Sequence, residues 1–379
     1  MDAAFIGIAA ACFWALALLA RGGAVLVAFL HPAVARRRAG RGDRPPLSVI
    51  VPVAQEEPEA DAAFASLFDQ AYPGFEVLVT SAHEDSEAIG TARRAALRFP
   101  HVPTRFLTGN QRHTLNPKVS NIEPAVAAAA HELILVKDSN VTLPPGHLTE
   151  MVRSLRPGVG MVCTLPVGLH PRSFAAEIEC AMTNAYAAPW LLGGSFIGMN
   201  IGFGKVMLFD RREFRRAGGL DVMSSTFGDD HALAKSLGRL GLRTVFSGGV
   251  VHRVMGRRTL REVWDRQLRW ILIRRRESLL AFLAEPLSCA GTATLAGALA
   301  APVLGVPGWA AASATAVAWL AGDVIVVAGR GWGLSWRFPM AVVCREAMVY
   351  ALWLRTWSTR TVSWAGERFD VGPSPRKAG

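Results

Sequence analysis

The sequence has few cysteines, and none of them is arranged for a disulfide framework or a zinc site. Five cysteines occur among 379 residues, which is an odd number, and no two of them have the Cys-x-x-Cys spacing of a zinc ribbon or a redox motif. Scattered cysteines of this kind are typical of reduced thiols with a structural role. The pattern excludes a disulfide-stapled scaffold and argues against a zinc protein.

Charged residues are scarce for a soluble enzyme, and acidic residues are the scarcer kind. Charged residues make up 19% of the chain and hydrophobic residues 51%, and the formal net charge is +11. A basic chain can bind nucleic acid, but no zinc-finger spacing, RNA-binding aromatic signature or isolated recognition helix occurs. The arginines instead gather beside apolar segments, at residues 36–38 and 274–276. We therefore expect contact with anionic lipid and no nucleic-acid partner.

The N-terminus holds a long run without charge. Residues 3–20 are uncharged, and apolar character resumes after Arg21 as far as Leu30, which is long enough to cross a hydrocarbon core of about 30 Å. The cationic start and small-residue cleavage site of a secretory signal peptide are missing. We predict a transmembrane helix at residues 1–31, followed by a basic cytoplasmic linker, rich in glycine and proline, at residues 32–46.

The segment from residue 47 to residue 258 is predicted to form one α/β domain. Short β-branched runs alternate with amphipathic helical stretches as far as residue 137, and the alternation then loosens. Such alternation indicates a mostly parallel sheet covered by helices on both faces, with ligands at the carboxyl ends of its strands. Strands are expected at residues 47–53, 75–80, 104–108, 132–137, 159–165 and 207–210, and helices at residues 60–68, 86–99 and 119–130.

The C-terminal part is apolar again. Residues 259–284 mix tryptophan and aliphatic side chains with arginines, which is typical of a helix lying along a membrane surface. Within residues 285–357, the uncharged stretch 286–322 is interrupted by Val306-Pro307-Gly308, which predicts two short spans joined by a tight turn. Residues 338–354 carry Arg345 and Glu346 near their middle, and an interfacial or re-entrant segment suits them at least as well as a span. Residues 358–379 form a basic tail.

Two acidic motifs are candidates for chemistry. Asp138, Ser139 and Asn140 follow a predicted buried strand, and a carboxylate with an amide oxygen suits Mg²⁺ or Mn²⁺ bridging a diphosphate, although the same residues are ordinary turn formers. Asp229 and Asp230 begin a predicted helix. They either stabilise its N-terminus or provide a general base, and the residues alone do not decide between the two.

Two basic motifs accompany them. Arg266 and Arg269 are three residues apart on one helix face, where they can bind phosphate oxygens, and Trp270 can pack against the membrane or line an acceptor site. A basic interfacial helix anchored by tryptophan is the alternative. Asn116 and Lys118, which flank a proline before a predicted helix, offer a cation and free backbone N–H groups to a diphosphate, although proline is common at helix starts.

Taken in order, these motifs resemble the inverting glycosyltransferases with the GT-A fold, and most closely the ceramide glucosyltransferase family, glycosyltransferase family 21. The similarity runs from about residue 47 to residue 369. The motifs that carry it are NPKVSN at 116–121, KDSN at 137–140, GDDHALAK at 228–235, RQLRW at 266–270 and SWAG at 363–366.

The resemblance implies a role for each motif. Asp138 would hold the divalent cation on the diphosphate, with Asn140 or Ser139 nearby, and Asp230 would deprotonate the lipid hydroxyl. Lys118, beside Asn116, would support the donor. Metal-assisted departure of the diphosphate, with proton removal from the acceptor, would invert the anomeric carbon. The residues that would close the site over diphosphate and acceptor are Arg266, Arg269 and Trp270.

The sequence departs from the family pattern at two places. The family usually has an Asp after the second strand that helps to read uracil, whereas this chain has His83, with Glu84 or Asp85 as candidates to replace it. Asn140 stands where many relatives beyond the ceramide glucosyltransferases have a second Asp. The first departure leaves donor-base recognition open, and the second weakens the expectation of tight metal binding.

We expect an integral enzyme of a bacterial plasma membrane with its catalytic domain in the cytoplasm, and the resemblance implies that it uses a UDP-sugar and a lipid hydroxyl. We expect glucose as the transferred sugar and ceramide as the acceptor, with diacylglycerol or a hopanoid as alternative acceptors. The glycine-rich run 193–202 is either an apolar access route for the lipid or a close-packed loop. A catalytically silent scaffold is the rival from another class. A processive polysaccharide synthase would need more spans, and a transporter would need an intramembrane acidic pathway. The sequence indicates no oligomeric state.

Overall fold

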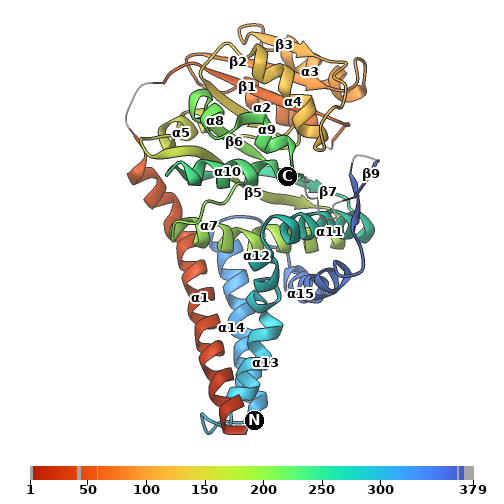
Figure 1. The fold of residues 1–379 in the computed structure, drawn as a ribbon. Helices are drawn as coiled ribbons and strands as arrows, with labels where there is room; N and C mark the ends of the chain where they lie inside the picture. Colours follow the sequence, from red (N-terminus) through yellow and green to blue (C-terminus); the bar gives the residue numbers. More distant parts are fainter. Residues whose placement is uncertain (1–2, 41–43, 58, 365–366, 371–379) are drawn as a thin grey trace, which may run out of the picture. The chain divides into compact units, whose positions relative to one another are not determined.

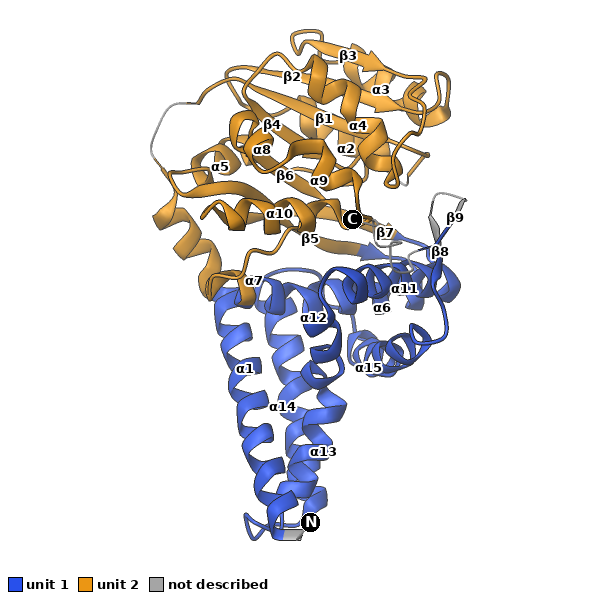
Figure 2. Ribbon diagram, in the orientation of Figure 1, with its two compact units in different colours: residues 1–29, 170–193, 256–379 blue, residues 30–169, 194–255 orange. Residues whose placement is uncertain are grey.

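The computed structural model describes residues 3–40, 44–57, 59–364 and 367–370. It divides into two compact units (Figure 2). We call residues 30–169 and 194–255 the sheet unit. Residues 1–29, 170–193 and 256–379 are the helical unit.

In the described part of the chain, the sheet unit is built on a seven-stranded sheet in the order β3-β2-β1-β4-β6-β5-β7. The first four strands are mutually parallel, which confirms the prediction from the alternating pattern, whereas β6 runs antiparallel to both β4 and β5. The sheet is therefore a mostly parallel platform with an antiparallel extension. The strands are β1 Leu47–Val53, β2 Phe75–Ser81, β3 Thr104–Leu107, β4 Leu133–Lys137, β5 Val159–Pro171, β6 Val206–Asp210 and β7 Arg243–Gly256.

Helices cover both faces of β1 because its side chains alternate between them. Val49 and Val51 lie in a core cluster with Phe64 and Leu67 of α2, and each fully buried side chain of this size contributes about 1.5–3 kcal/mol. Ile50 alternates to the opposite face and is fully buried, and α4 packs against β1. The helices of this unit are α2 Ala60–Phe68, α3 Glu87–Leu97, α4 Pro117–Ala128, α5 His147–Ser154, α8 Arg211–Arg216, α9 Gly219–Ser224 and α10 Asp229–Arg239 (Figure 1).

Strand β7 was not predicted, because Gly248 and Gly249 interrupt its apolar pattern. The structure shows why glycine stands there: the backbone N–H of Gly249 donates to the Glu150 carboxylate, and a Cβ at Gly249 would lie 2.6 Å from Glu150 Oε2. The carboxylate of α5 therefore requires the close approach that glycine allows. Strand β5 is also longer than predicted, since it continues past residue 165 to Pro171.

The helical unit is made of helices and one hairpin. Residues 181–187 form a π-helix, which joins α6 to α7. The elements are α1 Ala3–Arg38, α6 Phe174–Cys180, η1 Ala181–Ala187, α7 Ala188–Phe196, α11 Leu260–Glu277, α12 Leu279–Ala284, η2 Pro286–Ser288, α13 Ala290–Ala300, α14 Gly308–Gly329, α15 Phe338–Arg355, β8 Thr361–Trp364 and β9 Glu367–Asp370, of which α1 and α7 continue into the sheet unit.

Among the described residues, two helices are long and apolar enough to cross a membrane, at residues 4–38 and 308–329, and α13 is a shorter apolar helix. Helices α1, α13 and α14 run alongside one another, and α15 lies to one side of them, below α11 in the view (Figure 1). Trp14 Nε1 of α1 donates to Thr315 Oγ1 of α14 over 2.8 Å, and Gly297 of α13 faces that indole at close range. Leu19 on α1 is 73% exposed, as expected of a side chain that meets lipid.

Three predicted boundaries were wrong. Helix α1 continues through Pro32 to Arg38, so the start of the predicted linker is helical. Helix α14 continues beyond residue 322 to Gly329, because the carboxylate of Asp323 is paired with two arginines within the fold. The predicted helix at 259–284 is broken at Ser278, whose side chain accepts a hydrogen bond from Ala281 N–H and so begins α12. The membrane location of α15 stays a prediction.

Candidate functional site

Asp138 lies immediately after β4, at the carboxyl end of the parallel strands, where the alternating pattern predicted a ligand site. Its Oδ1 is 3.1 Å from Lys118 Nζ, and its Oδ2 accepts from Lys205 Nζ over 2.6 Å. Burial by itself would raise the pKa of Asp138, but the two ammonium groups outweigh burial and hold that pKa well below its ordinary value. Asp138 is therefore ionised at every physiological pH.

Lys118, the second residue of α4, lies at the centre of the site. Its ammonium group donates to the carbonyl oxygen of Gly204 over 2.9 Å and lies 3.8 Å from Asp229 Oδ2. Burial lowers the pKa of Lys118, whereas Asp138, Asp229 and Asp230 raise it, and the net pKa is above the ordinary value. Asp138 and Asp229, from two separate segments, thus lie within 4 Å of one charged lysine, and Asp230 is near enough to raise its pKa.

Asn116 fixes the start of α4 against α10. It is fully buried, and its side-chain oxygen accepts from the backbone N–H of Lys118 over 3.0 Å. Its amide group donates to the carbonyl oxygen of Thr226 over 3.1 Å and to Asp229 Oδ1 over 3.3 Å. The side chain of Asn116 is therefore committed to holding Lys118 and Asp229 in place.

Asp229 and Asp230 begin α10, whose N-cap is Gly228. Gly228 has no side chain with which to cap the helix. Asp229 Oδ2 lies 3.8 Å from Lys118 Nζ, and Asp230 also raises the pKa of that lysine. Burial raises the pKa of Asp229 to about 6; Lys118 opposes this rise, while Asp230 and Asp138 add to it. Asp230 Oδ1 accepts from His231 N–H over 2.8 Å.

The segment that precedes β6 packs tightly against Asp230 because two of its residues are glycines. A Cβ at Gly202 would lie 2.0 Å from the carbonyl oxygen of Asp230, so a side chain there would have to displace the start of α10. A Cβ at Gly204 would lie 3.2 Å from Asp230 Oδ2. The glycines bring Lys205 and the Asp230 carboxylate into the same small region.

The donor atoms around Asp138 fit a divalent cation that brings further ligands with it. Asn140 donates its amide to Glu57 Oε1 over 3.1 Å, which leaves Asn140 Oδ1 buried and without a hydrogen-bond partner in the part of the chain that the structure describes. An ionised carboxylate and an orphaned amide oxygen are ligands that Mg²⁺ and Mn²⁺ accept, with water and phosphate completing the shell. Among the described residues no group of three or more His, Cys, Asp or Glu side chains is placed to hold a metal ion. The protein by itself offers only part of a coordination shell.

The candidate uracil-reading residues lie in the loop after β2. His83, Glu84 and Asp85 are exposed, and the Glu84 carboxylate lies against Gly109, where a Cβ would be 2.9 Å from Glu84 Oε1. The backbone N–H of His83 donates to Ser81 Oγ over 3.1 Å. Which of the three meets a base stays a prediction.

The arginine motif belongs to the helical unit. Arg266 Nη1 donates to Oε1 of Glu179 over 2.6 Å, and Glu179, on α6, is fully buried. Arg269 and Trp270 follow on the same helix, α11, and both are partly buried. The roles of Arg266, Arg269 and Trp270 toward a diphosphate and an acceptor stay predictions.

Sequence reasoning missed three residues. Lys205 had a weak signal in the Gly202-Phe203-Gly204 run before a strand, since glycines there indicate close approach of the backbone. Lys137 was read only as part of the KDSN motif; burial outweighs Asp138 and lowers the pKa of Lys137 to about 7. Glu179 had no signal, because nothing in the sequence relates it to a helix more than 80 residues away. The C-terminal SWAG motif lies partly outside the described residues, at 365–366.

The chain is similar in sequence to known glycosyltransferases. The family model described as "Glycosyl transferase family 21" matches residues 8–377. Ceramide glucosyltransferase 1 of Caenorhabditis elegans is 26% identical over 245 residues, which cover 64% of this chain and 53% of the nematode protein. Ceramide glucosyltransferase of Komagataella phaffii is 31% identical over 113 residues, which cover 29% of this chain and 22% of the yeast protein. The chain thus spans about half or less of the length of these relatives.

A solved structure supports the fold. The mannosyltransferase of Pyrobaculum calidifontis in complex with GDP-Man and Mn²⁺ superposes with a TM-score of 0.50 at 18% sequence identity, and the match covers 91% of this chain and 99% of that protein. At this identity the likeness shows the fold alone. It agrees with the α/β GT-A architecture predicted from the alternating pattern and the motifs.

Proposed function

Because the chain belongs to glycosyltransferase family 21, we propose that it transfers a sugar from a UDP-sugar to the hydroxyl group of a membrane lipid, with glucose and ceramide as the substrates. The observation that carries the proposal is the gathering of three carboxylates around Lys118. Asp138 comes from the end of β4, and Asp229 and Asp230 come from the start of α10. This arrangement supplies a cation-binding carboxylate beside a base and a phosphate-binding ammonium group.

Asp138 and Asn140 would hold a divalent cation, and the cation would neutralise charge that develops on the departing UDP. Asp138 suits this role because the pKa of its carboxyl lies well below its ordinary value, so it remains an anionic ligand. Lys118 would bind a phosphate oxygen from the other side. Asn116 fixes the α4 backbone from which Lys118 extends, so the ammonium group is oriented before the donor arrives.

We assign Asp230 as the base and Asp229 as a positioning residue. Asp229 is buried and is held by Asn116 and Lys118, which leaves it little freedom to reach a substrate. The Asp230 carboxylate lies beside Gly204. It would accept the proton of the lipid hydroxyl as that oxygen attacks the anomeric carbon opposite the departing UDP, and the configuration would invert.

The helical unit would contribute the acceptor side and the membrane anchor. Arg266, Arg269 and Trp270 of α11 would close over the diphosphate and the acceptor, as the family resemblance implies. Helices α1 and α14, which are long and apolar enough to span, would anchor the protein, with the arginines at the end of α1 on the cytoplasmic face of a bacterial plasma membrane.

The test uses the full chain in lipid nanodiscs with ceramide and a panel of UDP-sugars, and it measures UDP release and the mass of the lipid product. We expect a hexosylceramide, and we expect Asp230→Asn to lower kcat by about 10²–10⁴-fold. Asp221→Asn, at an aspartate in the first turn of α9, is the matched control and should leave kcat unchanged. Turnover of Asp230→Asn at the wild-type rate would refute the base assignment.

The same assay separates the rival functions. Product formation with diacylglycerol or a hopanoid, but not with ceramide, would change the acceptor and keep the reaction. UDP binding without turnover on any lipid would instead indicate a silent scaffold.

A further inference from the structure

Lys205 belongs to none of the motifs that carry the family resemblance, yet it is joined to Asp138 twice. Its backbone carbonyl accepts from the N–H of Asp138 over 2.9 Å, and its ammonium group donates to Asp138 Oδ2 over 2.6 Å. The Lys205 side chain is 17% exposed. Lys205 therefore occupies one carboxylate oxygen of the residue that is proposed to hold the cation.

Each carboxylate oxygen of Asp138 lies against an ammonium group. Lys118 lies on Oδ1 and Lys205 on Oδ2, so a divalent cation that approached either oxygen would meet an ammonium group a few ångströms away. Like charges at that distance repel, and more strongly in a half-buried site than in water. One lysine has to leave before the cation can bind well.

Lys205 is the lysine that is free to leave. Lys118 is also held by the Gly204 carbonyl and by Asp229, whereas Asp138 is the sole partner of the Lys205 ammonium group among the described residues. Burial lowers the pKa of Lys205, Asp138 opposes this, and the nearby Arg253 adds to the lowering. A lysine in such surroundings gains from a second anion.

We propose that Lys205 is a diphosphate-binding residue that blocks the cation site on Asp138 until the donor arrives, and then moves its ammonium group to the donor's phosphate oxygens. The inference rests on the proposed function, because the anion is the diphosphate of the nucleotide-sugar. Donor and cation then enter together: the diphosphate draws Lys205 away, and the freed carboxylate oxygen faces the cation.

The experiment measures two affinities of the full chain in detergent without any acceptor. Mn²⁺ binding is followed by electron paramagnetic resonance of the free ion, with and without UDP, and UDP binding is followed by calorimetry. For the wild type we expect weak Mn²⁺ binding that UDP strengthens. For Lys205→Met we expect the two affinities to change in opposite directions. Mn²⁺ alone should bind about tenfold tighter. UDP should bind about tenfold weaker, because a charge-assisted hydrogen bond to phosphate is lost.

Matched variants make the result specific. Arg212→Met, at an exposed arginine of α8 that pairs with Glu132, should change neither affinity. Asp138→Asn should abolish the gain in Mn²⁺ affinity when it is combined with Lys205→Met. Lys205→Gln, which keeps a hydrogen-bond donor without the charge, repeats the test if the methionine variant folds poorly.

Several results would overturn the inference. One is tight Mn²⁺ binding by the wild type without UDP. Another is an unchanged Mn²⁺ affinity in Lys205→Met. A third is a loss of both the Mn²⁺ and the UDP affinity in that variant, as a general loss of structure would produce. A wild type that binds no UDP would refute the proposed function instead. In that case the Mn²⁺ affinities of the wild type and of Lys205→Met could still be compared, so failure of the inference and failure of the proposed function are distinguishable.

Discussion

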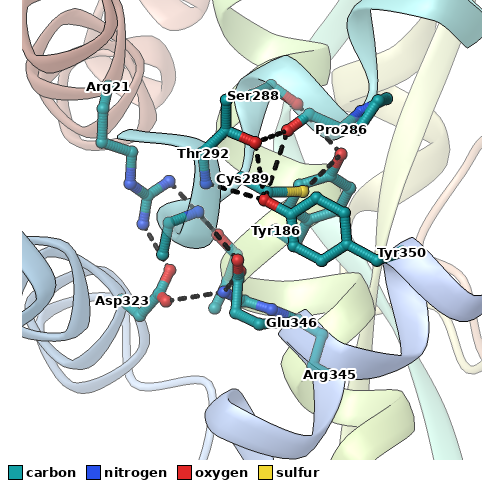
Figure 3. Close-up of polar contacts among 12 residues, drawn as sticks. Arg21, Tyr186, Pro286, Ser288, Cys289, Thr292, Asp323, Arg345, Glu346 and Tyr350 are labelled. Atoms are coloured by element: carbon teal, nitrogen blue, oxygen red, sulfur yellow. Dashed lines mark hydrogen bonds and ion pairs between the residues drawn. The ribbon is translucent and has the colours of Figure 1, made fainter. Parts of the chain in front are cut away.

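Replacing Asp323 with alanine tests how the helices of the helical unit are held together. Asp323 on α14 is fully buried, and its carboxylate is paired with Arg21 of α1 and with Arg345 of α15, the latter over 3.1 Å (Figure 3). Arg345 is also paired with Glu346. One carboxylate therefore connects three helices.

The magnitude follows from which charges lose a partner. In Asp323→Ala, Arg345 keeps Glu346, whereas Arg21 keeps a weak contact with the carbonyl oxygen of Ala185 at 3.4 Å and its position over the Trp319 ring, and neither is a counter-ion. One buried guanidinium is left uncompensated, and breaking a buried pair in this way costs about 3–5 kcal/mol. We therefore expect Asp323→Ala to lower the unfolding free energy by about 3–5 kcal/mol, the cost of one uncompensated guanidinium and not of two.

The assay is denaturant unfolding in detergent micelles, followed by tryptophan fluorescence. Asp61→Ala is the control, because Asp61 pairs with Arg98 on the exposed surface over 2.8 Å, where a salt bridge contributes about 0–1 kcal/mol. Arg21→Met in the Asp323→Ala background should recover part of the loss, since it removes the uncompensated charge. A loss below about 1 kcal/mol in Asp323→Ala, or additive effects in the double variant, would refute the reasoning.

Two further predictions concern the site and its surroundings. The pKa of Asp229 is raised to about 6 in the folded protein, so the protonated carboxyl stabilises the folded state. This stabilisation is fully present below about pH 4 and is lost as pH rises through about 6. Unfolding free energy should fall across that window, and Asp229→Asn should remove this part of the fall; an unchanged pH profile in the variant would contradict the assignment. Glu179→Gln should lower kcat/KM about tenfold by loosening Arg266, and the loss should disappear in an Arg266→Ala background; an equal loss in both backgrounds would show that Glu179 acts independently of that arginine.

Much of the fold could be predicted from local patterns. The β-branched runs at β1 to β4 and the amphipathic stretch of α2 agree with the structure closely, because strand and helix periodicity is a property of neighbouring residues. The uncharged run near residue 3 marked the start of α1. The spacing of Asp138, Asp229 and Asp230 within motifs pointed to the carboxylates that gather around Lys118.

What the local patterns missed depends on residues far apart in the chain. Gly249 lies in β7 where Glu150 of α5 approaches the strand closely, and α14 continues past Asp323, whose carboxylate is paired with Arg21 and Arg345.

The sequence by itself determined which segments are helical, extended or apolar, and which side chains could do chemistry, since these follow from composition and spacing along the chain. Only the tertiary structure decided that Lys205 lies on Asp138 and that Glu179 lies on Arg266. Such pairings depend on distances in space between segments separated by more than 60 residues, and no periodicity along the chain encodes those distances.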